Sequence, residues 1–240
     1  MAIQRGDKQI PDERAPGPII MLGPIKLTGA AAIGALITIL ALIGLLVAYL
    51  APTFSWSPLW ISAGLWLAFL IYWGRAAKNS APTASSESLK SRRFHQNLLS
   101  LALVFLFLRI PGINPRLLPG GLYFIVAGLA IHSGSFALAI WARRHLGRYW
   151  SGAVTIKVDH QIVDSGPYRL IRHPIYTAYL GMTVGTAMVS GRPLALIAVL
   201  ITVAAYWRKI RLEEETLRQA FGASYDAYRR KSWALIPGLF

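Results

Sequence analysis

Hydrophobic residues in this chain are grouped into six runs, separated by segments that carry nearly all of the charges. The first run, residues 27–50, contains no charged residue and exceeds the ~20 residues that a helix needs to cross the hydrocarbon core of a bilayer. The other runs are residues 56–73, 98–110, 121–142, 175–189 and 194–207. Three of these are short for complete spans, so we expect their helices to begin inside the flanking polar residues, to tilt, or to thin the bilayer locally. The pattern predicts an all-α, polytopic integral membrane protein with about six transmembrane helices.

Positive charges are distributed very unequally among the segments that connect these runs. Of the 25 Lys and Arg residues, 22 lie in the N-terminal segment, in residues 74–97 and 143–173, and after the last run. The alternate connections carry only Arg109, Arg116 and Arg192. Because Lys and Arg accumulate in cytoplasmic loops, this asymmetry predicts an even number of spans in a cytoplasmic-type or inner membrane, with both termini cytoplasmic.

Composition narrows the possible partners. The chain is 55% hydrophobic, and its formal net charge of +15 comes from residues that flank the apolar runs rather than from a soluble module. Membrane lipids are therefore the expected partners, and no nucleic acid is expected. The chain has no cysteine, which excludes disulfides and thiolate metal sites, and its five histidines show no ligand spacing, so no metal is expected.

The chain divides into three parts. Residues 1–26 are a charged, Pro- and Gly-containing cytoplasmic segment, and residues 27–110 hold N-terminal transmembrane helices with a Ser/Ala-rich loop at 79–91. Residues 120–240 form the predicted functional core. Within it, 143–173 is predicted to be a structured cytoplasmic segment, and 208–231 an amphipathic helix with a break at Gly222 that lies on the cytoplasmic face.

The first candidate for a functional site is the sequence Arg172-His173-Pro174. Proline suits the first position of a helix, so the fifth run is predicted to start as a helix at Pro174. Arg172, His173 and the free N–H groups of the helix start would then meet at one point, which suits binding of a carboxylate. The alternative is that Arg172 contacts a lipid phosphate and His173 is an ordinary interfacial histidine.

The main acidic cluster is Glu213-Glu214-Glu215. Successive helical positions turn by about 100°, so at most two of the three carboxylates share a face and the third is exposed or paired. One alternative is that all three form surface ion pairs with neighbouring basic residues. The other is that a carboxylate of the cluster faces Arg172 and His173, where it recognises an ammonium group or orients a nucleophile.

Other polar and small residues in the runs have simpler interpretations. His132 is predicted to be neutral and hydrogen-bonded across a close helix contact, and the pair Gly181 and Gly185 to be a helix-packing motif. Aromatic residues near the ends of the runs are predicted to be anchors at the membrane interface: Tyr149, Trp150, Tyr206 and Trp207.

Two motifs together resemble a known family. The sequence HQIVDSGPYRLIRHPIY, a helical hairpin, and then EEETLRQAFGASYDAYRRKSWALIP resemble the isoprenylcysteine carboxyl methyltransferase family of integral membrane methyltransferases and its phospholipid methyltransferase relatives. The resemblance covers 128–237. It implies S-adenosylmethionine as methyl donor in a cytoplasmic pocket. Carried over residue by residue, it implies that the cofactor contacts His160, Val163, Gly166, Tyr168, His173, Tyr176, Glu213 and Glu214.

The resemblance also implies the catalytic residues and the acceptor. Arg172 and Glu214 fall in the two motifs, and Lys209 stands where the family usually has an arginine, with Arg208 and Arg211 beside it. The implied acceptor is a lipid-like or small molecule with a carboxylate, thiol or amine, an isoprenylcysteine carboxylate being one candidate. The resemblance implies nothing about the oligomeric state.

Two other functions are compatible with the sequence. A membrane reductase of the sterol C14-reductase type, which uses NADPH, shares a similar C-terminal architecture, although the Gly-Pro-Tyr before Arg-His-Pro and the E-E-x-x-L helix favour the methyltransferase. A non-catalytic membrane protein or transporter that has kept the core would bind no nucleoside cofactor.

Overall fold

The structure, a computed structural model, describes residues 19–22, 25–28, 57–77, 83–110, 115–157 and 161–238. The chain forms two compact units, Met1–Ala48 and Tyr49–Phe240. In the first unit the described strands β1 (Ile19–Leu22) and β2 (Ile25–Thr28) pair as an antiparallel hairpin. The predicted first span, 27–50, lies outside the described residues except for its first two positions, which belong to β2.

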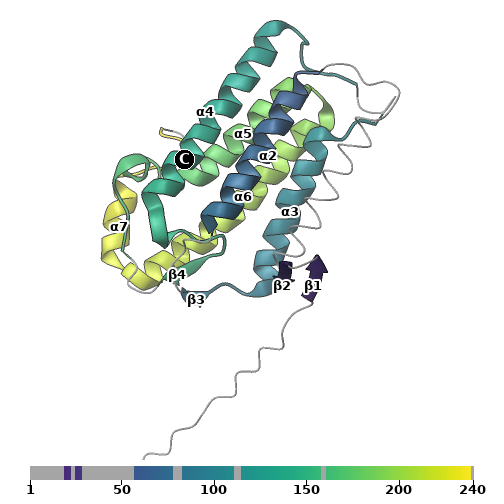
Figure 1. Ribbon diagram of the computed structural model, residues 1–240. Helices are drawn as coiled ribbons and strands as arrows, with labels where there is room; N and C mark the ends of the chain where they lie inside the picture. Colours follow the sequence, from purple (N-terminus) through teal and green to yellow (C-terminus); the bar gives the residue numbers. More distant parts are fainter. Residues whose placement is uncertain are drawn as a thin grey trace, which may run out of the picture. The chain divides into compact units, whose positions relative to one another are not determined.

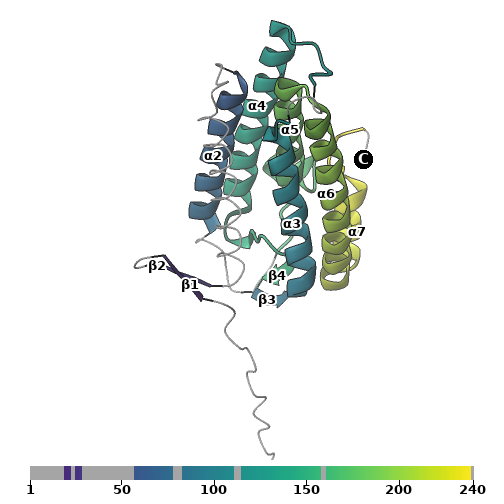
Figure 2. The same ribbon diagram turned by 90° about the vertical axis from the view of Figure 1, so that its right-hand side faces the viewer.

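The second unit is a helical bundle. Figures 1 and 2 show its long helices packed side by side. The helices are α2 (Leu59–Ala76), α3 (Leu89–Phe107), α4 (Leu122–Leu146), α5 (Pro174–Ser190) and α6 (Pro193–Phe221), followed by the short α7 (Ala223–Arg230). One end of the bundle carries α7 and the connections α2–α3 and α4–α5 (Figure 1), and the opposite end carries the turn between α5 and α6.

Helices α3 and α6 extend well beyond the apolar runs that predicted them. The Ser88 side chain accepts a hydrogen bond of 3.2 Å from the Ser91 N–H and caps the N-terminus of α3, so the predicted 79–91 loop is shorter than expected. That loop also contains strand β3 (Thr83–Ser86), which pairs with β4 (Thr155–Lys157). The run at 194–207 and the predicted amphipathic helix are one continuous helix of 29 residues, α6, which ends at the predicted break, Gly222 (φ 52°).

Three helices of the described part are long and apolar enough to cross a membrane: α2, α6, and α4 with the turn that follows it, Leu122–Tyr149. In the most apolar windows of α2 and of α4, only 17% of the residues are buried inside the protein. An apolar surface of this extent suits contact with lipid. The total of six spans stays a prediction.

Glycines allow α4 and α5 to approach closely. A Cβ atom on Gly185 would lie against the Gly128 carbonyl and 2.7 Å from the His132 backbone nitrogen, and one on Gly181 would overlap the Ser135 hydroxyl. The interpretation of Gly181 and Gly185 as a packing motif is confirmed. This contact joins the first and middle turns of α4 to the middle and last turns of α5.

Replacing Gly185 with alanine is expected to lower the free energy of unfolding in detergent by about 1–3 kcal/mol, because the added methyl group has no room between the two backbones. The matched control is Gly134→Ala in α4, where a Cβ atom would meet nothing within 4 Å. An equal loss in both variants would show that the close approach of α4 and α5 does not matter.

His132 is completely buried and links three helices. Its Nδ1 lies 3.1 Å from the Thr186 hydroxyl of α5, which accepts a 3.0 Å hydrogen bond from the Trp66 indole of α2. The prediction that His132 is hydrogen-bonded across a close helix contact is confirmed.

Candidate functional site

The segment before α5 folds as a compact turn and then starts the helix. Residues Gly166–Arg169 form a 3₁₀ turn, η3, and Pro174 is the first residue of α5, as predicted. Gly166 has φ +58°, and a Cβ atom there would lie 2.6 Å from the His145 ring at the end of α4. Glycine at this position therefore lets the turn pack directly on α4.

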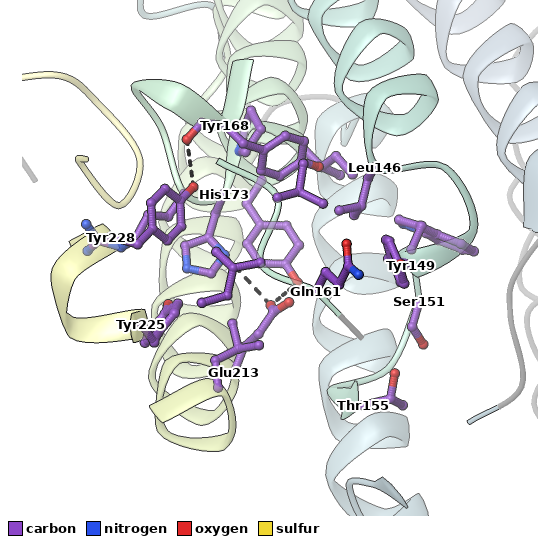
Figure 3. Close-up of a pocket in the computed structure, with 18 of the residues that line it drawn as sticks. Leu146, Tyr149, Ser151, Thr155, Gln161, Tyr168, His173, Glu213, Tyr225 and Tyr228 are labelled. Atoms are coloured by element: carbon purple, nitrogen blue, oxygen red, sulfur yellow. Dashed lines mark hydrogen bonds and ion pairs between the residues drawn. The ribbon is translucent and has the colours of Figure 1, made fainter. Parts of the chain in front are cut away.

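A pocket lies between this segment, α6, α7 and the turn after α4. Figure 3 shows Glu213, Tyr225 and Tyr228 on one side and Tyr149 and Ser151 on the other. Its enclosed part has a volume of about 100 Å³. The remaining lining residues are Leu146, Trp150, Ala153, Thr155, Gln161, Ile162, Val163, Tyr168, Arg172, His173, Pro174, Ile175, Tyr176 and Leu217.

Glu213 presents a carboxylate to this pocket. The Tyr176 hydroxyl donates a 2.5 Å hydrogen bond to Glu213 Oε2, and His173 Nδ1 lies 3.8 Å from the same oxygen (Figure 3). The His173 and Tyr176 rings stack with their centroids 5.2 Å apart and their planes within 4°. The two rings thus hold one oxygen of Glu213 in place and leave the carboxylate at the pocket wall.

Glu214 lies behind this wall in an ion-pair network. Its Oε1 accepts a 2.8 Å hydrogen bond from Arg172 Nε and lies 3.4 Å from His173 Nε2, while its Oε2 lies 3.3 Å from Arg229 Nε. The side chains of Arg172 and Glu214 are only 10% and 13% exposed. The guanidinium of Arg172 also donates to the backbone carbonyls of Arg229 and Ser232. Arg172 therefore ties α6 and α7 to the segment before α5.

The chain after α7 returns to this segment. The Arg172 N–H donates to the Trp233 carbonyl (2.8 Å), and the Trp233 N–H donates to the Leu170 carbonyl (2.9 Å). The His173 N–H donates to the Ala234 carbonyl (3.1 Å). These backbone contacts hold the Arg-His sequence against the chain that follows α7, and no side-chain pattern signals them because they involve main-chain groups only.

Lys209 is buried and lies outside the pocket lining. Its Nζ donates a 2.7 Å hydrogen bond to the Gly152 carbonyl and lies 5.6 Å from the centroid of the Tyr176 ring. The Tyr176 ring, which stacks on His173, also stacks on the Tyr206 ring, with the centroids 4.6 Å apart. Lys209 therefore holds the turn after α4 against α6, one ring away from Glu213.

Three tyrosines in the walls are permanent hydrogen-bond donors. Burial raises the pKa values of Tyr168, Tyr225 and Tyr228 well above the ordinary value for a phenol. The Tyr228 hydroxyl donates a 2.6 Å hydrogen bond to the Tyr168 carbonyl (Figure 3). Because these hydroxyls keep their protons at neutral pH, none of them acts as a base in this pocket.

The structure brings most of the predicted site residues to one place. Val163, Tyr168, Arg172, His173, Tyr176 and Glu213 line the pocket. Gly166, Glu214 and Lys209 support its walls from behind, and His160 lies outside the described residues. Glu215 is exposed and accepts a hydrogen bond from Gln219. The roles assigned to these residues stay predictions.

Sequence reasoning missed several lining residues and misassigned two aromatic ones. Trp150 and Tyr206, predicted as interface anchors, are buried, with 9% and 5% of their surface exposed. Trp150 packs edge-on against Trp73 and under Arg143, whose guanidinium donates to the Ala76 carbonyl at the end of α2. An aromatic residue near the end of an apolar run can be an anchor at the membrane interface or a buried residue in a pocket wall. Its position in the sequence alone did not distinguish these two roles.

Comparison with known proteins assigns this part of the chain. The isoprenylcysteine carboxyl methyltransferase (ICMT) family model matches residues 128–219, which include α5, most of α4 and α6, and the pocket lining except for the residues of α7. Over these residues the chain is ICMT-like. The match includes Arg172, His173 and Glu214 of the ion-pair network but excludes α2, α3 and α7, so the ICMT-like region is one part of the bundle.

Curated relatives agree with this assignment. A "Probable protein-S-isoprenylcysteine O-methyltransferase" of Oryza sativa subsp. indica is 31% identical over 120 residues, 49% of this chain and 59% of the rice protein. The "Protein-S-isoprenylcysteine O-methyltransferase" of Dictyostelium discoideum is 33% identical over 82 residues, 34% of this chain and 35% of its own. A "Nickel-cobalt-cadmium resistance protein NccN" of Alcaligenes xylosoxydans xylosoxydans is 31% identical over 96 residues, 39% of this chain and 45% of its own.

Proposed function

We propose that this protein is an integral membrane methyltransferase that uses S-adenosylmethionine. The observation that carries the proposal is the Glu213 carboxylate held by Tyr176 and His173 at the start of α5, inside the ICMT-like region. The rice and Dictyostelium relatives are named as O-methyltransferases, which supports the same reaction class.

The residues present suit the methyl donor. Glu213 matches an ammonium or sulfonium charge, and the aromatic ring of Tyr149 suits a cation or an adenine. Arg172 is already paired with Glu214, so its side chain is not spare for the donor's carboxylate. The enclosed volume of about 100 Å³ is below the roughly 300 Å³ of small ligand sites, so part of the ligand would extend through the open mouth.

S-adenosylmethionine supplies, when bound, a methyl group that a nucleophile attacks as the carbon–sulfur bond breaks. Methyl transfer of this kind depends mainly on alignment and on exclusion of water. Glu213, Tyr176 and His173 would orient the donor, and the apolar wall of Trp150, Ile175 and Val163 would exclude water. A carboxylate acceptor needs no base, which agrees with the protonated state of the wall tyrosines.

The acceptor is proposed to be lipid-like. The curated relatives' names favour an isoprenylcysteine carboxylate, whereas the name of the resistance protein specifies no acceptor. The segregation of Lys and Arg supports a multi-pass topology with both termini and the pocket on the cytoplasmic side. The donor would then reach the pocket from the cytoplasm, and the acceptor from the bilayer.

Titration calorimetry of the purified protein tests this function. We expect saturable binding of S-adenosylhomocysteine, the product form of the donor, and no binding of NADPH. Saturable binding of NADPH alone would identify a reductase of the sterol C14-reductase type. Binding of neither nucleotide would favour a non-catalytic membrane protein.

A further inference from the structure

A second polar cluster lies where α3 packs on α6, outside the region matched by the ICMT family model on its α3 side. Figure 2 shows α3 running alongside α6. Arg92 and His95 lie one turn apart near the start of α3, and Arg208 lies on α6. We call these three residues the α3–α6 cluster.

The cluster carries more positive charge than the nearby described residues neutralise. Glu87 is the acidic side chain at its edge, and both of its oxygens are engaged: Oε2 accepts a 2.6 Å hydrogen bond from the Ser91 hydroxyl and Oε1 a 3.0 Å bond from the Val154 N–H. Arg208 is anchored by a 2.7 Å hydrogen bond from Nη2 to the Ser91 hydroxyl. Anchoring of this kind orients the guanidinium without neutralising it.

Three buried nitrogen atoms of the cluster have no hydrogen-bond partner among the described residues. They are Nε of Arg92, Nη1 of Arg208 and Nδ1 of His95. The whole His95 residue is only 6% exposed. A buried polar atom without a partner is costly, and three of them in one place are uncommon in a native protein. Their grouping indicates a site that a ligand satisfies.

His95 presents a ring nitrogen to such a site. Burial, and then the nearby cation of Lys209, lowers the pKa of His95 to about 4, so the ring is neutral at neutral pH. Its buried Nδ1 has no hydrogen-bond partner among the described residues. The ligand must therefore offer a polar group to His95 and an anionic oxygen to the two arginines.

The cluster is close to the pocket but separate from it. The His95 ring packs edge-on against Tyr206 with centroids 5.4 Å apart, and Tyr206 stacks on Tyr176 at 4.6 Å. Phe94, which is 51% exposed, lies beside the cluster under the Arg208 guanidinium at 5.3 Å. An exposed aromatic residue next to half-buried cations suits a ligand that has a charged head and an apolar chain.

We infer that the α3–α6 cluster binds the headgroup of an anionic amphiphile, with its oxyanion between Arg92 and Arg208 and a polar group on His95. Two sources offer this chemistry. One is the methyl acceptor, whose carboxylate adjoins an amide N–H if it is an isoprenylcysteine; this source rests on the proposed function. The other is a phospholipid such as phosphatidylglycerol, with a phosphate and hydroxyls, and it does not depend on the proposed function.

Binding is measured with the full chain in a zwitterionic detergent. The probes are N-acetyl-S-farnesylcysteine and its methyl ester, phosphatidylglycerol and phosphatidylcholine, and inorganic phosphate. We expect Arg92→Gln and Arg208→Gln each to weaken binding of the preferred anionic amphiphile by about tenfold or more, since each removes a charge-assisted hydrogen bond. The matched control is Arg211→Gln, an exposed arginine one turn along α6, which should change the affinity less than about twofold.

The probes separate the two sources. Preference for the farnesylcysteine acid over its ester supports the acceptor, and preference for phosphatidylglycerol over phosphatidylcholine supports the phospholipid. Binding of inorganic phosphate alone, equal binding of the charged and neutral partners, or binding that neither arginine variant changes would overturn the inference. Each variant is first checked by its unfolding temperature, and Arg208→Lys replaces Arg208→Gln if the latter does not fold.

A failure of amphiphile binding at the α3–α6 cluster can be distinguished from a failure of the proposed methyltransferase function. S-adenosylhomocysteine affinity in the Arg92 and Arg208 variants should stay within about twofold of the parent, because neither side chain is expected to contact the donor. If the parent protein does not bind S-adenosylhomocysteine, the proposed methyltransferase function is refuted. Binding of phosphatidylglycerol would still be tested independently.

Discussion

Replacing Glu213 with alanine is expected to weaken S-adenosylhomocysteine binding by about 10–100-fold. A hydrogen bond to a charged group contributes about 1.5–3 kcal/mol, and Glu213 is the acidic side chain that lines the pocket. Calorimetry on the purified protein measures the change. The variant should keep its fold, because the hydrogen bond to Tyr176 and the contact with His173 are at the pocket wall and Glu213 is half-buried.

Glu215→Ala is the control for this substitution, because Glu215 has the same chemistry in the same helix but is exposed. It should change the affinity less than about twofold. Tyr176→Phe removes the 2.5 Å hydrogen bond and keeps the ring. Its loss of S-adenosylhomocysteine affinity should lie between the losses of Glu213→Ala and Glu215→Ala. Equal losses for Glu213→Ala and Glu215→Ala would contradict the register in which Glu213 faces the donor.

Arg172→Ala is expected to lower the free energy of unfolding by about 3–5 kcal/mol, because it leaves the buried Glu214 carboxylate without its closest partner. The same substitution removes the donors to the carbonyls of Arg229 and Ser232, so α7 and the following chain should detach as well. Denaturant unfolding in detergent micelles measures the loss, with the fluorescence of Trp233 as a local signal.

The control is Arg218→Ala, whose ion pair with Asp226 at 3.2 Å has partners that are 49% and 37% exposed. An exposed pair contributes about 0–1 kcal/mol, so this variant should be nearly as stable as the parent. Arg172→Lys keeps the charge but not the planar set of donors, and is expected to restore only part of the stability. If Arg172→Ala and Arg218→Ala lower the free energy of unfolding by the same amount, the Glu214 network would not be what holds α5, α6 and α7 together.

The accuracy of the sequence-based predictions depended on how local each signal was. The helix start at Pro174 and the break at Gly222 were predicted correctly, since proline and glycine act through their own backbone dihedrals. The apolar runs alone did not mark the boundaries of α3 and α6, because a hydropathy run ends where polar residues begin while the helix continues as long as its hydrogen bonds do. The expectation that a short run begins inside the flanking polar residues is confirmed for α3. Lys209 illustrates this: it stays helical and buried beyond the predicted end of the run.

For the candidate site, the sequence predicted residue types and the structure decided partners. The two motifs placed Glu213, Glu214, Arg172 and His173 near one another, which the structure bears out in their contacts. The sequence did not predict that Glu214 would form ion pairs with Arg172 and Arg229 while Glu213 faces the pocket. That choice depends on the rotation of α6 about its axis, and the rotation is set by packing against α5 and α3.

The sequence by itself determined that this is a mainly helical, apolar chain with an ICMT-like region, because hydropathy and motif spacing are properties of consecutive residues. Only the tertiary structure decided which side chains share a space. It joined Trp233 to Leu170 through main-chain hydrogen bonds, and it brought Arg92 and His95 of α3 against Arg208 of α6. Contacts of this kind connect residues about 60 to 120 positions apart, and they follow from how whole helices pack, which no local pattern encodes.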